Sequence, residues 1–387
     1  MAVAHVNPEV LRWAVERADV TSADLGKALR KTETAVEGWL DGSSMLTFRQ
    51  AQDLAKRLRV PFGYLFLSEP PHEELPIADF RRGSDVDRVR PSVDLRDTIA
   101  ETLRKQDWYR DFRLDNNEEP LKVVGLFSID SRTADVAESI ASTLDFAVKV
   151  RSETQNDRFL RAFVDQVEAQ GILVVRNGVV QQDTNRALNV EEFRGFSLVD
   201  PMAPVIFINN TDSASVKIFT LAHELAHIWI GQGGISDADP TVTSNGTSDV
   251  ETFCNAVAAE LLLPWSQVAT SWRQRKTAMS ERVRSVSREF NVSTVMVARQ
   301  LWTHSAISRE DFFGFYEQER DNWTATRQQS SGGNYYWNVS VRNSRLLTRA
   351  LLRSVDAWKT SMLEASRLLG RVKPANFKEL KKSLGML

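Results

Sequence analysis

The residues of this chain best suited to chemistry are two histidines and a glutamate in the pentad H-E-L-A-H, residues 223–227. On a helix, positions i and i+4 lie on one face, so His223 and His227 can bind one cation while Glu224 lies on its open side. These residue types at this spacing indicate a zinc site, because Glu224 could then take a proton from a metal-bound water. With five histidines among 387 residues, the pattern is expected by chance on the order of 0.004 times in such a chain.

A structural interpretation of the pentad stays open. The run from Phe219 to Gly231 is mostly apolar, and it could be the buried side of an amphipathic helix whose histidines are satisfied by hydrogen bonds. A longer zinc signature adds a glycine and a third histidine after the pentad. That signature is excluded, because the chain has Ile230 and Gly233 at those two positions.

A zinc site of this kind needs a third protein ligand, for which a glutamate on a later helix is typical. Glu251 opens the segment E-T-F-C-N-A-V-A-A-E-L-L-L-P, whose alanines and leucines predict a helix that ends at Pro264. Asn255 follows four residues after Glu251 and therefore lies on the same face. We expect Glu251 to bind the metal and the Asn255 amide oxygen to accept a hydrogen bond from a ligand imidazole.

Other carboxylates could compete for the third position. Asp237, Asp239 and Asp249 lie in the Gly/Ser/Thr/Asp-rich stretch 231–249 between the two predicted helices. A solvated loop usually carries such carboxylates for solubility, whereas Glu251 combines a helical setting with a partner on its own face. Glu251 is therefore the favoured ligand.

Hydrolysis also needs a second group to stabilise the negative oxygen of the intermediate, commonly a histidine, tyrosine or arginine. By residue type His304, Tyr316, Tyr335 and Tyr336 are candidates. Each of them also fits an exposed or capping position, and the sequence does not choose among them.

The composition is typical of a globular intracellular protein. With 42% apolar and 26% charged residues, the chain can form two or three domains with proper cores. Its single cysteine, Cys254, excludes an intramolecular disulfide and, among apolar neighbours, indicates a small buried residue rather than a nucleophile. The N-terminus lacks the pattern of a signal peptide, and no run of about 18 apolar residues occurs. We expect a cytoplasmic protein without a membrane segment.

Charge is distributed unevenly along the chain. The net charge of −2 divides into 9 − 8 = +1 for residues 1–60, 21 − 10 = +11 for residues 268–387, and −14 for the residues between. A basic C-terminal third can contact nucleic acid or an acidic protein, but a scattered solvated surface is the commoner cause.

Residues 1–67 have the pattern of five short helices, expected from Pro8 onward and over 21–29, 32–40, 47–58 and 61–67. The set resembles the Xre/Cro-type helix-turn-helix domain, with residues 32–40 as the recognition helix. That resemblance implies binding to double-stranded DNA, for which Arg30, Lys31 and Arg49 are possible phosphate contacts. The recognition helix carries Glu33 and Glu37 and no basic residue, so docking to a protein is an open alternative.

The remaining chain predicts an α+β, mostly helical fold. Residues 68–95, rich in proline and charge, are expected to be a linker with an ordered tether across the next domain. Residues 96–267 are expected to form a zincin-like peptidase domain with a small antiparallel or mixed sheet, and residues 268–387 a helical, basic region. Expected strands are 171–175, 194–199 and 205–209; expected helices are 94–111, 134–144, 156–170, 281–290, 293–301, 309–320, 343–358 and 362–369. Residues 287–301 also resemble a helix-turn-helix unit, for which plain packing is the favoured interpretation.

Three segments together give a specific resemblance: G-F-S-L-V-D-P-M-A-P-V-I-F-I-N-N, F-T-L-A-H-E-L-A-H-I-W and E-T-F-C-N-A-V-A-A-E-L-L-L-P. They resemble the ImmA/IrrE family of bacterial metallopeptidases, in the subgroup with an N-terminal Xre-type domain. The resemblance implies a zinc-dependent endopeptidase that cuts a protein partner, such as a phage or stress-response repressor. Its ligands would be His223, His227 and Glu251, with Glu224 as the base. Because family members also occur beside toxin genes, the alternative is a DNA-binding antitoxin or repressor whose zincin fold binds a toxin.

Overall fold

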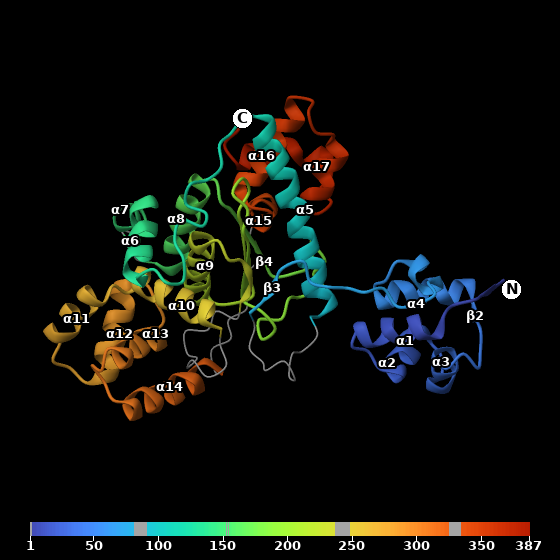
Figure 1. Cartoon of the computed structure of the whole chain (residues 1–387), viewed down its shortest axis with the longest axis horizontal. Helices are drawn as coiled ribbons and strands as arrows, with labels where there is room; N and C mark the ends of the chain where they lie inside the picture. Colours follow the sequence, from blue (N-terminus) through green and yellow to red (C-terminus); the bar gives the residue numbers. More distant parts are fainter. Residues whose placement is uncertain (1, 81–90, 152, 154, 237–247, 325–333) are drawn as a thin grey trace. The chain divides into compact units, whose positions relative to one another are not determined.

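The chain is described by a computed structural model that covers residues 2–80, 91–151, 153, 155–236, 248–324 and 334–387 (Figure 1). It divides into two compact units. The first comprises residues 1–76 and 88–99, and the second comprises residues 77–87 and 100–387. The chain therefore passes from the first unit into the second and back before the second unit continues from residue 100.

The first unit contains the five short helices that the sequence predicts. Their N-termini are set by side-chain caps: Asn7, Thr21, Thr32 and Thr47 each accept a hydrogen bond from a backbone N–H one turn or less ahead. The unit also contains a short two-stranded antiparallel sheet, in which β1 (Val3–Ala4) pairs with β2 (Leu46–Thr47). The sequence did not predict this sheet. The helices are α1 (Pro8–Arg17), α2 (Ser22–Leu29), α3 (Glu33–Leu40), α4 (Phe48–Leu58) and the 3-10 helix η1 (Phe62–Phe66).

The second unit is built on a five-stranded mixed sheet with the strand order β3-β7-β5-β6-β4. The three predicted strands are present as β4, β5 and β6, while β3 and β7 were not predicted. Strand β4 runs parallel to β6, β5 runs antiparallel to both β6 and β7, and β3 runs parallel to β7 at the edge. The strands are β3 (Ala78–Asp79), β4 (Leu173–Asn177), β5 (Gly195–Leu198), β6 (Val205–Asn209) and β7 (Gly234–Ser236).

Helices surround this sheet and make the fold α+β and mostly helical, as the sequence predicts. Helix α9 packs directly on β5 and β6, and α6, α8 and α10 pack on α9 (Figure 1). Helices α15 and α16 contact β4. The helices of the unit's first part are α5 (Val93–Asp115), whose residues 93–99 belong to the first unit, α6 (Thr133–Thr143), α7 (Phe146–Lys149), α8 (Asn156–Ala169), α9 (Ala214–Ile230) and α10 (Asp249–Leu262). Those of its second part are α11 (Trp265–Gln274), α12 (Met279–Phe290), α13 (Thr294–Thr303), α14 (Arg309–Thr324), α15 (Tyr335–Arg342), α16 (Arg345–Asp356), α17 (Met362–Leu368), η2 (Pro374–Asn376) and α18 (Phe377–Ser383).

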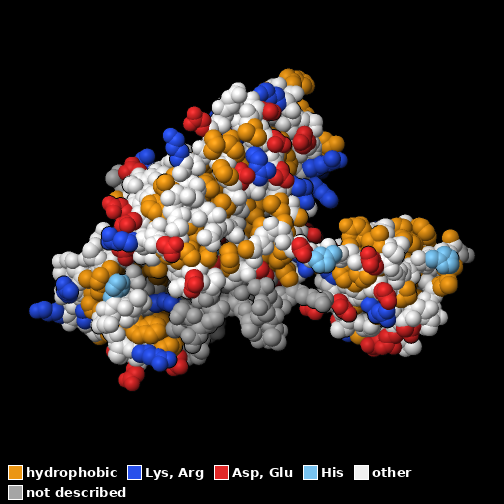
Figure 2. All heavy atoms as spheres, in the orientation of Figure 1, with side chains coloured by type: hydrophobic (Ala, Val, Ile, Leu, Met, Phe, Trp, Pro, Cys, Tyr) orange, Lys and Arg blue, Asp and Glu red, His pale blue; other side chains and the backbone are white. Residues whose placement is uncertain are grey.

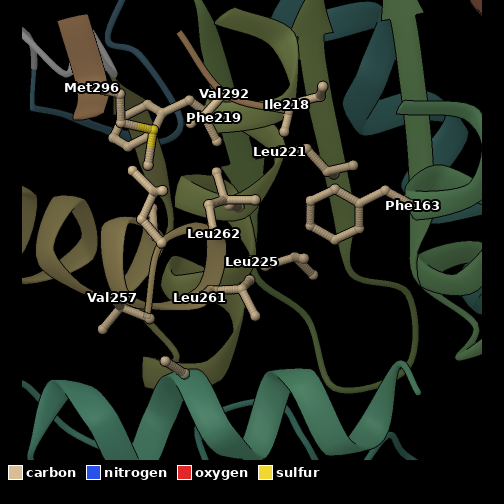
Figure 3. Close-up of a cluster of buried hydrophobic side chains, with 14 of the residues drawn as sticks. Phe163, Ile218, Phe219, Leu221, Leu225, Val257, Leu261, Leu262, Val292 and Met296 are labelled. Carbon is tan, nitrogen blue, oxygen red and sulfur yellow. The ribbon is translucent and has the colours of Figure 1, made fainter. Parts of the chain in front are cut away.

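One hydrophobic core joins the sheet to helices on both sides of residue 268. Figure 3 shows Phe163 of α8, Leu225 of α9, Leu261 of α10 and Met296 of α13 turned toward one another. The expected boundary between residues 267 and 268 is therefore corrected: α12, α13 and α14 contribute Val283, Leu301 and Phe312 and other apolar side chains to the same core. The α12–α13 pair, which resembles a helix-turn-helix unit, packs through Val292 and Met296, in line with the packing interpretation.

The expected linker of residues 68–95 contains regular structure at two places. Its residues 78–79 form strand β3 of the sheet, and α5 begins within it at Val93. Among the described residues, no helix is both long enough and apolar enough to cross a lipid bilayer.

Candidate metal centre

Helix α9 carries the H-E-L-A-H pentad through the middle of the second unit. Its N-terminus is capped by Ser213, and it ends at Gly231, whose φ of +71° is the left-handed conformation that glycine adopts without strain. Nearly every side chain from Ile218 to Ile230 is buried, because the sheet and the neighbouring helices enclose the helix on all sides. His223 and His227 are 0% exposed, so their polar atoms need partners inside the protein.

Helix α10 brings the third ligand candidate, the carboxylate of Glu251, close to the two histidines. Ser248 caps this helix by accepting a hydrogen bond from the backbone N–H of Glu251, which fixes Glu251 in the first turn. The Glu251 carboxylate lies 3.3 Å from His223 Nε2 and 3.1 Å from His227 Nε2, and the two Nε2 atoms are 3.0 Å apart. Among the described residues, these three form the group whose ligand atoms converge closely enough to hold a metal ion.

The outer nitrogens of both imidazoles are held by acceptors. His227 Nδ1 lies 2.7 Å from the backbone oxygen of Gln232, and His223 Nδ1 lies 3.0 Å from Asn255 Oδ1. A carbonyl oxygen only accepts, so each Nδ1 carries the proton and donates it. Each Nε2 then presents its lone pair to the other at 3.0 Å. Such a pair is repulsive unless a cation or a shared proton lies between, and this geometry fits a metal-binding pair.

The Glu251 carboxylate and the two imidazoles stabilise one another's charged forms. Burial alone would raise the pKa of Glu251, but the imidazoles of His223 and His227 lower it to about 2. Burial likewise disfavours the charged imidazoles, yet Glu251 raises the pKa of His223, and Cys254 and Glu251 raise the pKa of His227 to about 10. Without a metal the cluster therefore holds protons tightly, because its positive charge neutralises a buried carboxylate.

Glu224 lies on the same helix and is fully buried. One carboxylate oxygen, Oε1, accepts a hydrogen bond from the Ser236 hydroxyl on β7, whereas Oε2 is a buried oxygen without a hydrogen-bond partner among the described residues. Burial raises the pKa of Glu224. Gly195 on β5 leaves the space that this side chain needs, since a Cβ there would lie 3.0 Å from Glu224 Oε1 and 2.9 Å from the backbone oxygen of Phe207. An unpartnered carboxylate oxygen beside a candidate metal cluster is suited to accept a proton.

The part of the chain that contains this cluster matches a known protein family. Residues 167–301 match the model of a peptidase family that is described as the IrrE N-terminal-like domain. This stretch is an IrrE N-terminal-like domain. It runs from the end of α8 through the sheet to α13, and it contains His223, Glu224, His227 and Glu251. The ImmA/IrrE resemblance is thereby confirmed for residues 167–301, and this domain is of the metallopeptidase type. No curated protein sequence matches the chain.

Three aspartates of the IrrE N-terminal-like domain were alternatives to Glu251 as the third ligand, and the one that lies among the described residues is not part of the cluster. Asp249 begins α10 and is absent from the group of converging ligand atoms. Asp237 and Asp239 lie outside the described residues. Cys254 is buried and free, as the sequence predicts, and burial raises the pKa of its thiol. A neutral thiol at this position is a poor nucleophile.

The candidates for a second electrophile contact other aromatic side chains. The His304 ring stacks on Trp265 with 4.0 Å between ring centroids, and Tyr316 stacks on Phe312. Tyr335 and Tyr336 pack against each other at the start of α15. These contacts assign none of the four to the metal cluster.

Three contacts of the site were not predicted from the sequence. The Ser236 hydroxyl binds Glu224, the Gln232 backbone oxygen binds His227, and the Phe80 ring lies parallel to the His227 ring at 5.7 Å between centroids. Gln232 follows directly from the helix end at Gly231 and could have been anticipated. Ser236 and Phe80 lie on or beside very short strands, which leave no periodic pattern in the sequence.

The residues proposed for DNA contact lie in the first unit and are exposed. Arg30 is the left-handed residue that ends α2, Lys31 follows it, and Arg49 lies in the first turn of α4. Glu33 and Glu37 are exposed on α3, and Figure 2 shows acidic side chains gathered over α2 and α3 on the face in view. This helix pair therefore presents mixed charge rather than a continuous basic surface.

Proposed function

We propose that this chain is a zinc-dependent endopeptidase that cuts a protein partner, a transcriptional repressor or stress regulator in a bacterial or phage system. The convergence of His223, His227 and Glu251 supports it most directly. A tetrahedral zinc ion with ligands at about 2.0–2.2 Å would hold its ligand atoms about 3.3–3.6 Å apart. The observed separations of 3.0 to 3.3 Å lie at and just below the short end of that range, and two imidazoles with one carboxylate are a donor set of catalytic zinc sites.

The residues of the chain would share the work of hydrolysis. When bound, zinc would polarise the scissile carbonyl and lower the pKa of a water ligand to about 7. Glu224 would take the proton at Oε2 and deliver it to the leaving amine, and its raised pKa suits both transfers. The Ser236 hydroxyl would hold the other carboxylate oxygen in place. Asn255 and Gln232 would fix both imidazoles with Nε2 toward the ion.

The test separates metal binding from hydrolysis. Full-length wild-type protein, expressed in its host, is expected to contain about one zinc per chain and to create new N-termini in a small set of cellular proteins. Glu224→Gln should retain zinc and create none of these N-termini. Glu260→Gln, a partly exposed control on α10, should behave as wild type. Zinc binding with unchanged biological function in Glu224→Gln would favour the alternative of a toxin-binding protein, and absence of zinc would refute the peptidase.

Double-stranded DNA is a second candidate partner, supported by one surface of the first unit. Arg30, Lys56 and Arg57 line a hollow of about 440 Å³ together with Asp53. Phosphate contacts of this kind are sequence-independent and weaken with salt. Retention of wild-type protein on a duplex at 50 mM salt, reduced in an Arg30→Ala variant, would support DNA binding. Equal retention of both proteins would refute this surface.

A further inference from the structure

Strand β3 lies along the edge of the sheet of the second unit, although it comes from a part of the chain far from the other strands. Ala78 pairs with Gly234 and Asp79 with Ile235 in a parallel register. The backbone N–H of Phe80 then donates to the oxygen of Ile235 at 2.9 Å. The outer edge of β7 is therefore occupied by residues that come from a distant part of the sequence.

The same segment reaches the candidate metal centre. The Phe80 ring lies parallel to the ring of His227, with an interplanar angle of 10° and 5.7 Å between centroids. Gly234 makes room for it, because a Cβ at that position would lie 2.5 Å from Phe80 Cε2 and 2.7 Å from the backbone oxygen of Ala78. A side chain on residue 234 would expel the ring, so the absence of one is part of how Phe80 is held.

Strand β7 also carries Ser236, the residue that binds Glu224. The edge that β3 occupies thus belongs to a strand that contacts the proposed base. An extended peptide commonly binds a protein by adding a strand to a free sheet edge, where main-chain hydrogen bonds hold it. Here the edge is filled, and His223, Glu224 and His227 are 0% exposed. A scissile carbonyl cannot reach Glu224 unless a covering group moves.

We propose that Ala78–Phe80 is an internal inhibitory strand, which occupies the edge of β7 in place of a substrate peptide and covers His227 with the Phe80 ring. The inference rests on the proposed function, since it concerns access to that same site. The strand is only two residues long, so a competing peptide can displace it. Its covalent attachment supplies an effective concentration in the millimolar range, which is enough to keep a weak strand bound.

The experiment measures access to the metal in full-length, zinc-loaded protein. The probe is the chelator pyridylazoresorcinol, whose capture of zinc is followed by absorbance. Phe80→Ala should lose zinc about tenfold faster than wild type, the order expected when an aromatic contact is removed. Phe66→Ala is the matched control, since Phe66 is a half-exposed aromatic residue of the first unit that contacts other phenylalanines. Its rate should equal that of wild type.

A peptide added in trans distinguishes inhibition from damage to the fold. A peptide with the sequence of residues 74–80, E-L-P-I-A-D-F, should slow zinc loss from Phe80→Ala back toward the wild-type rate. The same peptide with alanine in place of its phenylalanine should have no effect. A misfolded variant would not respond to either peptide, and that result would overturn the proposal. Equal rates in wild type and Phe80→Ala with one zinc bound would refute the inhibitory strand alone, whereas failure of the wild type to bind zinc would refute the proposed function as well.

Discussion

Removal of the Asn255 side chain tests whether the outer contacts of the cluster control metal affinity. Its amide oxygen lies 3.0 Å from His223 Nδ1, and His223 is 0% exposed, so in the wild type this nitrogen depends on an acceptor supplied by the protein. In Asn255→Ala the metal-free protein can relieve the loss by changing the protonation or rotation of His223. The metal-bound protein cannot, because the ion fixes Nε2. We therefore expect the cost to fall on the bound state.

The magnitude follows from such outer contacts in other metal sites. Loss of a partner to a ligand imidazole weakens metal affinity about 10- to 100-fold, or about 1.4 to 2.8 kcal/mol. This agrees with the cost of about 1 to 3 kcal/mol for a buried donor left without an acceptor. Asn255→Asp keeps an acceptor and should stay within about tenfold of wild type.

The assay is competition for zinc between the protein and a chelator of known affinity at fixed pH. Ala256→Ser, an exposed position on the same helix, is the control and should bind zinc as wild type does. Wild-type affinity in Asn255→Ala, alongside lost binding in Glu251→Ala, would show that the orientation of His223 does not depend on this amide.

Three further predictions concern pH and stability. The pKa values of His223 and His227 are raised, so the metal-free cluster holds protons that zinc must displace. Zinc affinity should therefore rise with pH between 6 and 8, by up to about tenfold per pH unit for each proton released. Titrations of zinc binding at three pH values check this, and an affinity that does not change with pH would contradict it. Gly195→Ala should lower the free energy of unfolding by about 1 to 3 kcal/mol, since the new Cβ would lie 2.7 Å from Thr220 Cγ2, with the thermal midpoint as the measure. Thr47→Ala removes the capping box of α4 and should destabilise the first unit by about 0.5 to 2 kcal/mol in urea, whereas Thr34→Ala, exposed on α3, should have a much smaller effect.

The convergence of the metal cluster follows from regular helix geometry. His223 and His227 are four residues apart, as are Glu251 and Asn255, and a helix places such pairs on one face whatever its surroundings. A pattern within each helix was therefore sufficient to predict which side chains share a face and could converge on a metal ion. How α9 and α10 approach each other is decided by the apolar residues between them, and the sequence did not show this.

The edge of the sheet could not be predicted in this way. Strands β3 and β7 have two and three residues, too few for an alternating pattern to be recognised, and their partners lie far apart in the chain. The contacts of Phe80 and Ser236 depend on that pairing. Likewise, the C-terminal helices were predicted as helices, but their membership of the core around Leu225 depends on tertiary packing, which local periodicity does not encode.

Because β3 precedes residue 100 in the chain, truncation of the N-terminal residues affects the sheet of the second unit. A fragment that starts at residue 100, where the second unit resumes, would lack strand β3. The N–H and C=O groups along one side of β7 would then lose their partners. Bare strand edges promote pairing between molecules, so such a fragment is expected to self-associate and to be harder to purify than the full chain. The same cut removes residues 93–99 of α5, so poor behaviour of that fragment would reflect the missing strand and the shortened helix and would say nothing against the fold of the peptidase domain itself.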